Sequence, residues 1–156
     1  MRLTPVTRGA LAPNQQQVLD AIEQGPRAKG RPGIGLIGPF GVWVRAPGVG
    51  GPIQKVGEAI RFTTSLASNV QEVAICTVGA FHHSKFEFST HKALAIQAGV
   101  SESCLDLLRD GEDPDFNGDE GLSYKIARVM LTEHGISDAT YGLGLARFTE
   151  TGMIEL

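Results

Sequence analysis

Residues 69–99 read NVQEVAICTVGAFHHSKFEFSTHKALAIQAG, and this stretch decides the fold. Residues 73–81 are apolar at nearly every position, which is typical of a helix buried on all sides. The next segment, 84–98, repeats apolar residues three and four apart, as one face of a helix does. The two segments are separated by only two histidines. The stretch therefore predicts a buried helical hairpin.

Capping residues mark the ends of the two hairpin helices. Asn69 followed by Glu72 fits a capping box, in which the first residue is the N-cap and the acid stands at N3. Ser84 followed by Glu87 repeats the pattern and starts the second helix there. Gly99 ends that helix as its C′ residue, because glycine adopts the left-handed conformation at little cost.

The rest of the sequence also predicts helices, and we find no convincing alternating strand. Periodicity, proline positions and cap residues indicate further helices over residues 13–23, 52–66, 102–109, 119–134 and 138–151, the last of them capped by Ser137. Residues 38–44 fit either a short helix or a strand. We expect an all-α fold of about seven or eight helices with the hairpin at its centre.

Length and composition indicate a single globular domain. The chain has 156 residues, enough for one core and too few for two comfortable ones. Glycine and proline crowd the region from Gly25 to Gly57, which must turn often. We therefore expect an N-terminal helix and Gly/Pro-rich lead-in over residues 1–37 and a helical core over residues 38–156, together one domain.

Charge and hydropathy exclude several classes of partner. A formal net charge of −3 gives no overall attraction to nucleic acid or to an anionic membrane. No apolar run approaches the roughly 20 residues that span a bilayer. The N-terminus lacks the apolar run of a signal peptide, so we expect a cytoplasmic protein. Cys76 and Cys104 are accordingly expected to be reduced residues of the core.

One face of the second hairpin helix carries the candidate chemistry. Glu87 and His91 stand four residues apart on a largely apolar face, so both are expected to point toward an interior or a pocket. A carboxylate and an imidazole one turn apart can share a proton, which general acid–base catalysis uses. Glu72 in the preceding helix is a candidate third member.

These residues resemble the core signature of the carboxymuconolactone decarboxylase/alkylhydroperoxidase D-like superfamily. The resemblance is carried by Glu72 and the three residues after it, by the segment 82–91 (HHSKFEFSTH) and by the segment 95–101 (AIQAGVS), with weaker support from 38–40 and 45–47. It covers residues 11–156 and implies the helical fold of the alkylhydroperoxidase D-like type.

The resemblance also separates two chemistries. The peroxidase branch has a Glu, then two cysteines three residues apart, then a His four residues later. Matched to this sequence, Glu72 and His91 are retained, whereas Ser84 and Glu87 stand in place of the cysteines. A serine cannot be oxidised to a sulfenic acid, which disfavours a thiol peroxidase. The decarboxylase branch is similar in having Glu and His there, so the resemblance implies a cofactor-independent lyase with Glu72, Ser84, Glu87 and His91 as catalytic residues.

The substrate implied by the resemblance is a small carboxylated lactone or a related cyclic metabolite. Arg45 or Arg61 is expected to hold its carboxylate, because a guanidinium binds carboxylates through paired hydrogen bonds. Phe40 and Trp43 are most simply core residues, but they can also form the floor of a pocket. His83 is a further candidate contact at the hairpin turn.

Simpler interpretations exist for the same residues. Glu72 and Glu87 can serve as capping residues only, and His91 can be a hydrogen-bonded core histidine. A metal site is disfavoured, because His83 and His91 on one continuous helix stand about 12 Å apart along its axis. We therefore expect no metal and no cofactor. A non-catalytic oligomeric binding protein with the same fold remains the alternative to an enzyme.

The resemblance implies a homotrimer or homohexamer. Members of the superfamily continue past the position of Leu156 into an apolar helix. We therefore expect either that the pocket is closed differently here or that another copy of the chain covers it. The apolar face of the hairpin independently indicates a surface that needs a partner.

Overall fold

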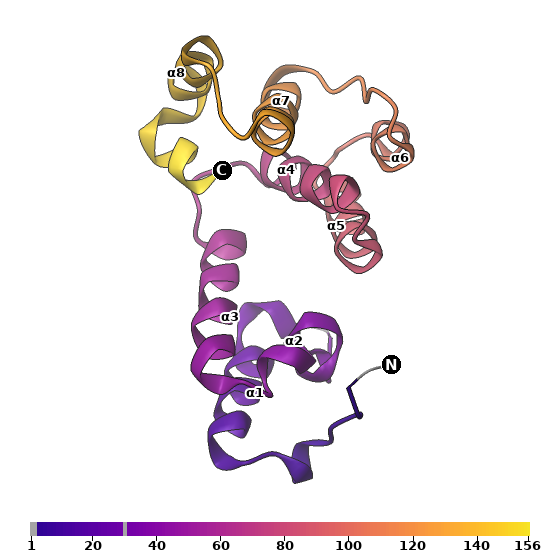
Figure 1. The fold of residues 1–156 in the computed structure, drawn as a ribbon, viewed down its shortest axis with the longest axis vertical. Coiled ribbons are helices and arrows are strands. Elements are labelled where there is room, and N and C mark those ends of the chain that lie inside the picture. The colour runs from indigo at the N-terminus through magenta and orange to yellow at the C-terminus, as the bar shows by residue number, and fades with distance from the viewer. Residues whose placement is uncertain (1–2, 30) are drawn as a thin grey trace. The chain divides into compact units, whose positions relative to one another are not determined.

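The structure is a computed structural model that describes residues 3–29 and 31–156 (Figure 1). These residues form eight α-helices and three 3₁₀ helices, and none of them is in a strand. The all-α prediction and the expected number of helices are thus confirmed. Met1 and Arg2 of the expected lead-in, and Gly30 within it, lie outside the described residues.

The chain divides into two compact units, Met1–Thr64 and Ser65–Leu156. Each unit has a hydrophobic core of its own, one in the first unit and two adjoining clusters in the second. The expected organisation as one domain with a lead-in over residues 1–37 stays a prediction.

The first unit packs three α-helices and three short 3₁₀ turns around a small core. They are η1 (Arg8–Ala10), α1 (Pro13–Gln24), η2 (Pro26–Ala28), η3 (Ile34–Leu36), α2 (Gly38–Trp43) and α3 (Pro47–Phe62). Leu19, Ile22 and Val44 are completely buried at its centre. The segment that fitted a helix or a strand is the helix α2, and the helix predicted from Pro13 to residue 23 is α1.

The expected start of the third helix at Pro52 is wrong. α3 begins at Pro47 and ends at Phe62, so Pro52 lies inside it. Pro47 stands at the first helical position, where the missing N–H is not needed and the fixed φ suits a helix. Pro52 gives up one hydrogen bond to the turn before it. The last helical residue is Phe62, four residues before the predicted end at residue 66.

The second unit is built around α4. Its helices are α4 (Ser68–Phe81), α5 (Lys85–Gln97), α6 (Glu102–Asp110), α7 (Gly118–Glu133) and α8 (Asp138–Glu155). α4 packs against α5, α6 and α7, and α8 packs against α7 (Figure 1). The expected hairpin is therefore α4 with α5, and it forms the centre of this unit.

The end of the hairpin is as predicted. Gly99 has a φ of 95° and its N–H donates to the carbonyl of Ile96, while the N–H of Val100 donates to the carbonyl of Ala95. These two bonds make a Schellman motif, which pairs the last carbonyls of α5.

The expectation that α4 is buried on all sides is wrong. Val73 and Cys76 are fully buried, but the side chains of Val78 and Phe81 are 42% and 36% exposed. An apolar sequence permits burial on every face of a helix, but the neighbouring helices decide which faces are covered. Here α5, α6 and α7 leave one face of α4 open.

The predicted N-cap at Asn69 is also wrong. The N-cap of α4 is Ala67, and Asn69 lies inside the first turn, where its amide donates to Glu120 of α7 at 2.8 Å. Ser84 is the N-cap of α5 as predicted, but its side chain makes no capping bond. The two capping boxes therefore do not form, so Glu72 and Glu87 are not explained as capping residues.

Ser137 is a true cap, which gives a prediction for stability. Its hydroxyl accepts a hydrogen bond from the backbone N–H of Thr140 at the start of α8. We expect Ser137→Ala to lower the free energy of unfolding by about 1 kcal/mol, because that N–H loses its partner. Ser101→Ala is the matched control, since Ser101 caps α6 without a side-chain capping bond and its loss should cost only a few tenths of a kcal/mol. Urea unfolding of both variants measures the difference, and equal losses would contradict it.

The last helix runs further than predicted, with a kink. α8 continues to Glu155, but Thr149 inside it has φ 66° and ψ 175°, so the helix breaks and restarts there. The carboxylate of Glu155 accepts hydrogen bonds from the backbone N–H and the hydroxyl of Ser65, at 2.9 and 2.6 Å. These bonds tie the last turn of the unit to its first residue.

None of the helices formed by the described residues combines the length and the apolar character that crossing a bilayer requires.

Candidate functional site

Three side chains of the hairpin form one polar line inside the second unit. Nδ1 of His91 lies 2.6 Å from Oε2 of Glu72, and Nε2 of the same ring lies 3.4 Å from Oε1 of Glu87. The side chains of His91 and Glu72 are only 9% and 6% exposed, whereas that of Glu87 is 41% exposed. The line therefore runs from a buried carboxylate through the imidazole to a carboxylate at the surface.

The hairpin itself creates this arrangement. α4 carries Glu72, and α5 returns beside it with Glu87 and His91 one turn apart on the face that also holds the buried Phe88 and Ala95. Gly79 lets the helices approach closely, because a Cβ there would stand 3.2 Å from the backbone nitrogen of Phe88. The prediction that Glu87 and His91 face inward on one stripe thus holds for His91, while Glu87 stands at the edge of the stripe.

The contact with Glu72 bears on where the imidazole carries its proton. When Glu72 is ionised it can only accept, so the contact then takes the hydrogen bond of a proton on Nδ1. The nitrogen that can gain or lose a proton toward Glu87 is then Nε2. The separation of 3.4 Å is an ion-pair distance and too long for a strong hydrogen bond, and a catalytic contact of this kind can shorten when a ligand binds. The sequence proposed Glu87 as the main partner of His91, but the structure gives Glu72 the closer contact.

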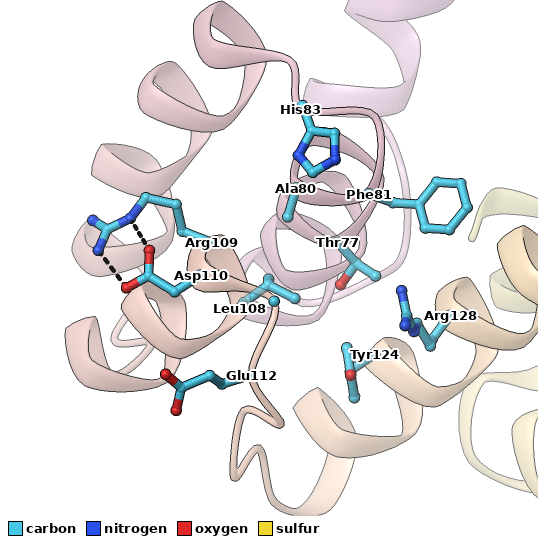
Figure 2. A pocket seen from close by; sticks show the side chains of 11 residues that line it. Thr77, Ala80, Phe81, His83, Leu108, Arg109, Asp110, Glu112, Tyr124 and Arg128 are labelled. Atoms are coloured by element: carbon cyan, nitrogen blue, oxygen red, sulfur yellow. Dashed lines mark hydrogen bonds and ion pairs between the residues drawn. The ribbon is translucent and has the colours of Figure 1, made fainter.

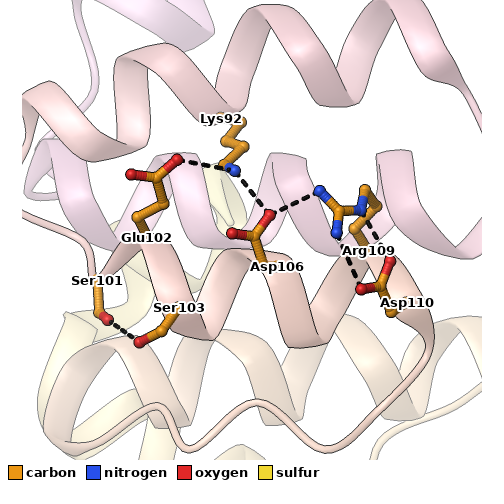
Figure 3. A network of polar contacts seen from close by, with 7 residues as sticks. All are labelled: Lys92, Ser101, Glu102, Ser103, Asp106, Arg109 and Asp110. Atoms are coloured by element: carbon orange, nitrogen blue, oxygen red, sulfur yellow. Dashed lines mark hydrogen bonds and ion pairs between the residues drawn. The ribbon is translucent and has the colours of Figure 1, made fainter.

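A network of charges holds α5 against α6 next to this site (Figure 3). Nζ of Lys92 lies 3.1 Å from Glu102 and 2.7 Å from Asp106, and Asp106 also binds Arg109 at 2.6 Å. Lys92 is the neighbour of His91 in the chain, so the network fixes the rotation of α5 about its axis. The side chain of Lys92 is only 18% exposed, which limits the freedom of its ammonium group.

The network predicts a specific response to acid. The hydrogen bond from Lys92 lowers the pKa of Asp106 below its usual 3.8. A carboxyl whose pKa is lowered in the folded state stabilises the fold above its unfolded pKa and loses that effect as the pH falls through the folded value. We expect Lys92→Met to lose less stability than the native chain between about pH 4 and pH 2. Urea midpoints across that range measure it, and identical pH profiles would contradict the prediction.

Ser84 and His83 line a neighbouring cavity and do not join the line of Glu72, His91 and Glu87. The cavity has a volume of about 410 Å³ and lies where α4 turns into α5, with Phe88 in its wall. His91 is not among its lining residues. His83 has a φ of 51° at the turn and an exposed side chain, as a contact for a small molecule requires.

The other predicted binding residues belong to the first unit. Phe40 is buried in its core and stacks edge-to-face on Trp43, with ring centres 5.3 Å apart. The guanidinium of Arg45 donates to the carbonyl of Thr4, and that of Arg61 lies over the ring of Phe62 at 5.0 Å. The core role of Phe40 is confirmed, and the substrate-binding roles stay predictions.

Neither cysteine supports thiol chemistry in this site. Cys76 and Cys104 are both free; Cys76 is buried in the core as predicted, whereas Cys104 is only partly buried and outside the core cluster, contrary to the prediction. Burial raises the pKa of Cys76 to about 12, with further help from the charge of Glu72. Its thiol is therefore protonated near neutral pH and is a poor nucleophile. Among residues 3–29 and 31–156, no three His, Cys, Asp or Glu side chains are placed to hold a metal ion.

The sequence did not predict Tyr124 and Arg128 as site residues, because no motif marks them. Tyr124 and Arg128 of α7 line a second cavity against the end of α4. They stand four residues apart in an ordinary amphipathic helix, and only the packing of α7 on α4 gives them a place in a cavity.

Comparison with protein-family models, curated proteins and solved structures gives no match for this chain.

Proposed function

We propose that the line of Glu72, His91 and Glu87 is an acid–base site, and that the protein is a cofactor-independent lyase similar to carboxymuconolactone decarboxylase. The observation that carries the proposal is the imidazole of His91 with a carboxylate on each ring nitrogen, one buried and one reaching the surface. This arrangement can deliver a proton at the exposed end while the buried end keeps the ring oriented.

Each residue has a distinct part in the proposed reaction. The substrate loses carbon dioxide when the carbon–carbon bond to its carboxylate breaks and the electron pair stays on the ring carbon, delocalised into the conjugated lactone. That carbon takes a proton from the Glu87 carboxyl, which water re-protonates at the exposed end, while His91 orients Glu87 through Nε2. Glu72 acts as a positioning residue through Nδ1. The net change replaces the carboxylate by hydrogen, with the proton restored from water at the exposed end.

The proposed substrate is a small carboxylated lactone or a related cyclic metabolite. Support comes from the exposed position of Glu87, which a small molecule can reach, and from the nearby cavity lined by Ser84 and His83. Arg45 and Arg61 stay candidates for binding the substrate carboxylate.

The test follows carbon dioxide release from a carboxymuconolactone. We expect Glu87→Gln and His91→Ala each to lower the rate by about 100-fold to 10,000-fold, the range that a general acid contributes. Glu87 is half exposed, so Glu87→Gln leaves the fold intact and separates loss of chemistry from loss of structure. Glu150→Gln is the matched control, because Glu150 is an exposed carboxylate on α8 with no part in the site. Unchanged rates in both site variants would end the proposal.

A thiol peroxidase remains disfavoured. That reaction needs a low-pKa thiolate beside a resolving thiol, whereas the pKa of Cys76 is about 12 and Ser84 occupies the position of one family cysteine.

One observation favours a second candidate, a non-catalytic binding or structural protein. His91 is buried, and its ring does not line the cavity formed by Ser84 and His83. In this case the Glu72–His91 contact only fixes the packing of the hairpin. Stability and activity of the paired substitutions discussed below separate the two roles.

We further propose that the protein is a cytoplasmic homotrimer or homohexamer. Exposed apolar side chains on the hairpin, among them Val78, Phe81 and Phe86, support association with further copies. Sedimentation equilibrium of the full chain measures the assembly, and a monomer at all concentrations would contradict it.

A further inference from the structure

A cavity separate from the acid–base site lies between α4, α6 and α7. It has a volume of about 290 Å³, at the lower end of the range of ligand sites, which begins near 300 Å³. Such a space takes a molecule with a single ring. Phe81 is nine residues along α4 from Glu72, which corresponds to about 13 Å along the helix axis.

The walls of this cavity combine aromatic surface with polar groups (Figure 2). Phe81 and Tyr124 contribute aromatic rings from α4 and α7, and Ala80 and Leu108 add apolar surface. His83 stands at the turn end of the cavity. A planar ring can pack against aromatic side chains with offset or edge-to-face geometry.

The charges in the cavity are unequally engaged. Arg109 is paired with Asp110 through two contacts of 2.8 and 2.9 Å, so this cation and this anion satisfy one another. Arg128 lies over the ring of Phe81, with 5.7 Å from the guanidinium carbon to the ring centre. The lining also holds the carboxylate of Glu112, and none of the ion pairs among the described residues joins it to Arg128. The guanidinium of Arg128 is thus the cation that remains available to a ligand.

Tyr124 supplies a hydroxyl next to this cation. Burial raises the pKa of Tyr124, so its phenol stays protonated and can donate a hydrogen bond. Arg128 and Tyr124 stand four residues apart on the same helix, and together they suit a carboxylate. The guanidinium can donate two hydrogen bonds to its oxygens, and the phenol can donate a third to a remaining lone pair.

We propose that this cavity binds a small planar ring carboxylate, with the carboxylate on Arg128 and Tyr124 and the ring against Phe81. None of Glu72, Glu87 and His91 lines this cavity, although it shares His83 with the cavity beside Ser84.

The experiment titrates the full chain with benzoate and follows the amide signals of α7 and of the end of α4 by NMR. We expect saturable binding that Arg128→Gln weakens about tenfold or more and Tyr124→Phe weakens severalfold, since each removes one contact to the carboxylate. Lys125→Gln is the matched control, because Lys125 is an exposed cation on the same helix that does not line the cavity. It removes the same charge and should leave the affinity unchanged.

Further arms of the titration decide between explanations. Acetate lacks the ring and benzamide lacks the charge, so both should bind more weakly than benzoate. The proposal is overturned if benzoate does not saturate, if acetate or benzamide binds as well as benzoate, or if Lys125→Gln weakens binding as much as Arg128→Gln.

Discussion

Glu72→Met lowers the free energy of unfolding of the second unit by about 3–5 kcal/mol, because it breaks a buried pair and leaves the imidazole of His91 without its carboxylate. His91→Leu is expected to cost a similar amount for the converse reason. The contact is 2.6 Å long and both side chains are less than a tenth exposed, so water cannot replace the lost partner.

The double variant Glu72→Met with His91→Leu is expected to recover most of this loss. Replacing both members of a buried pair by apolar side chains of similar volume is often neutral or stabilising. The interaction energy from the double-mutant cycle should therefore be of the order of the single losses. Both tyrosines, Tyr124 and Tyr141, lie in the second unit, so the NMR signals of their rings during urea unfolding report this unit. Additive losses in the double variant would contradict the prediction.

The same double variant separates catalysis from structure. If the pair serves acid–base chemistry, the double variant folds but releases no carbon dioxide from a carboxymuconolactone. If the pair only fixes the hairpin, a stable double variant should keep any function that the native chain has. A buried polar pair that apolar residues can replace without loss of stability is better explained by function than by stability.

Gly50→Ala is expected to destabilise the first unit by about 3 kcal/mol or more. This is at or above the upper end of the usual free-energy cost of overpacking a core. A Cβ on Gly50 would stand 2.1 Å from the carbonyl oxygen and 2.5 Å from the carbonyl carbon of Trp43. Both atoms are backbone, so no side chain can rotate away, and α2 must move relative to α3.

Gly48→Ala provides the matched control for this prediction. Gly48 lies two residues earlier in the same helix, and a Cβ there meets nothing within 4 Å. We expect it to be neutral or to stabilise by up to about 1 kcal/mol, since alanine is the better helix former. Trp43 is the only tryptophan and lies in the first unit, so its fluorescence during urea unfolding measures both variants. Equal stabilities would show that the contact with Trp43 is not tight.

The helices around the candidate site were predictable to within a few residues. The hairpin, the end of α5 at Gly99 and the cap of α8 at Ser137 follow from periodicity and from local hydrogen bonds of the backbone. Such signals need only neighbours in the chain, so a sequence carries them completely. The start of α3 was missed because two prolines, Pro47 and Pro52, both fit a helix start, and the sequence alone did not favour the first.

Local rules failed where a distant helix competed for the same side chain. Asn69 and Glu72 have the spacing of a capping box, but Glu120 and His91 bind them instead. The choice depends on the packing of α5 and α7 on α4, which a pattern within one helix does not contain.

By itself, the sequence determined that this protein is helical, where its central hairpin lies, and that Glu87 and His91 share a helix face, because backbone hydrogen bonding and side-chain periodicity are local. Only the tertiary structure decided that the buried Glu72 is the closer partner of His91, that α4 keeps an open face, and that Tyr124 and Arg128 line a cavity. These features arise from side chains far apart in the chain, and the free energy of burying them together exists only once the helices pack.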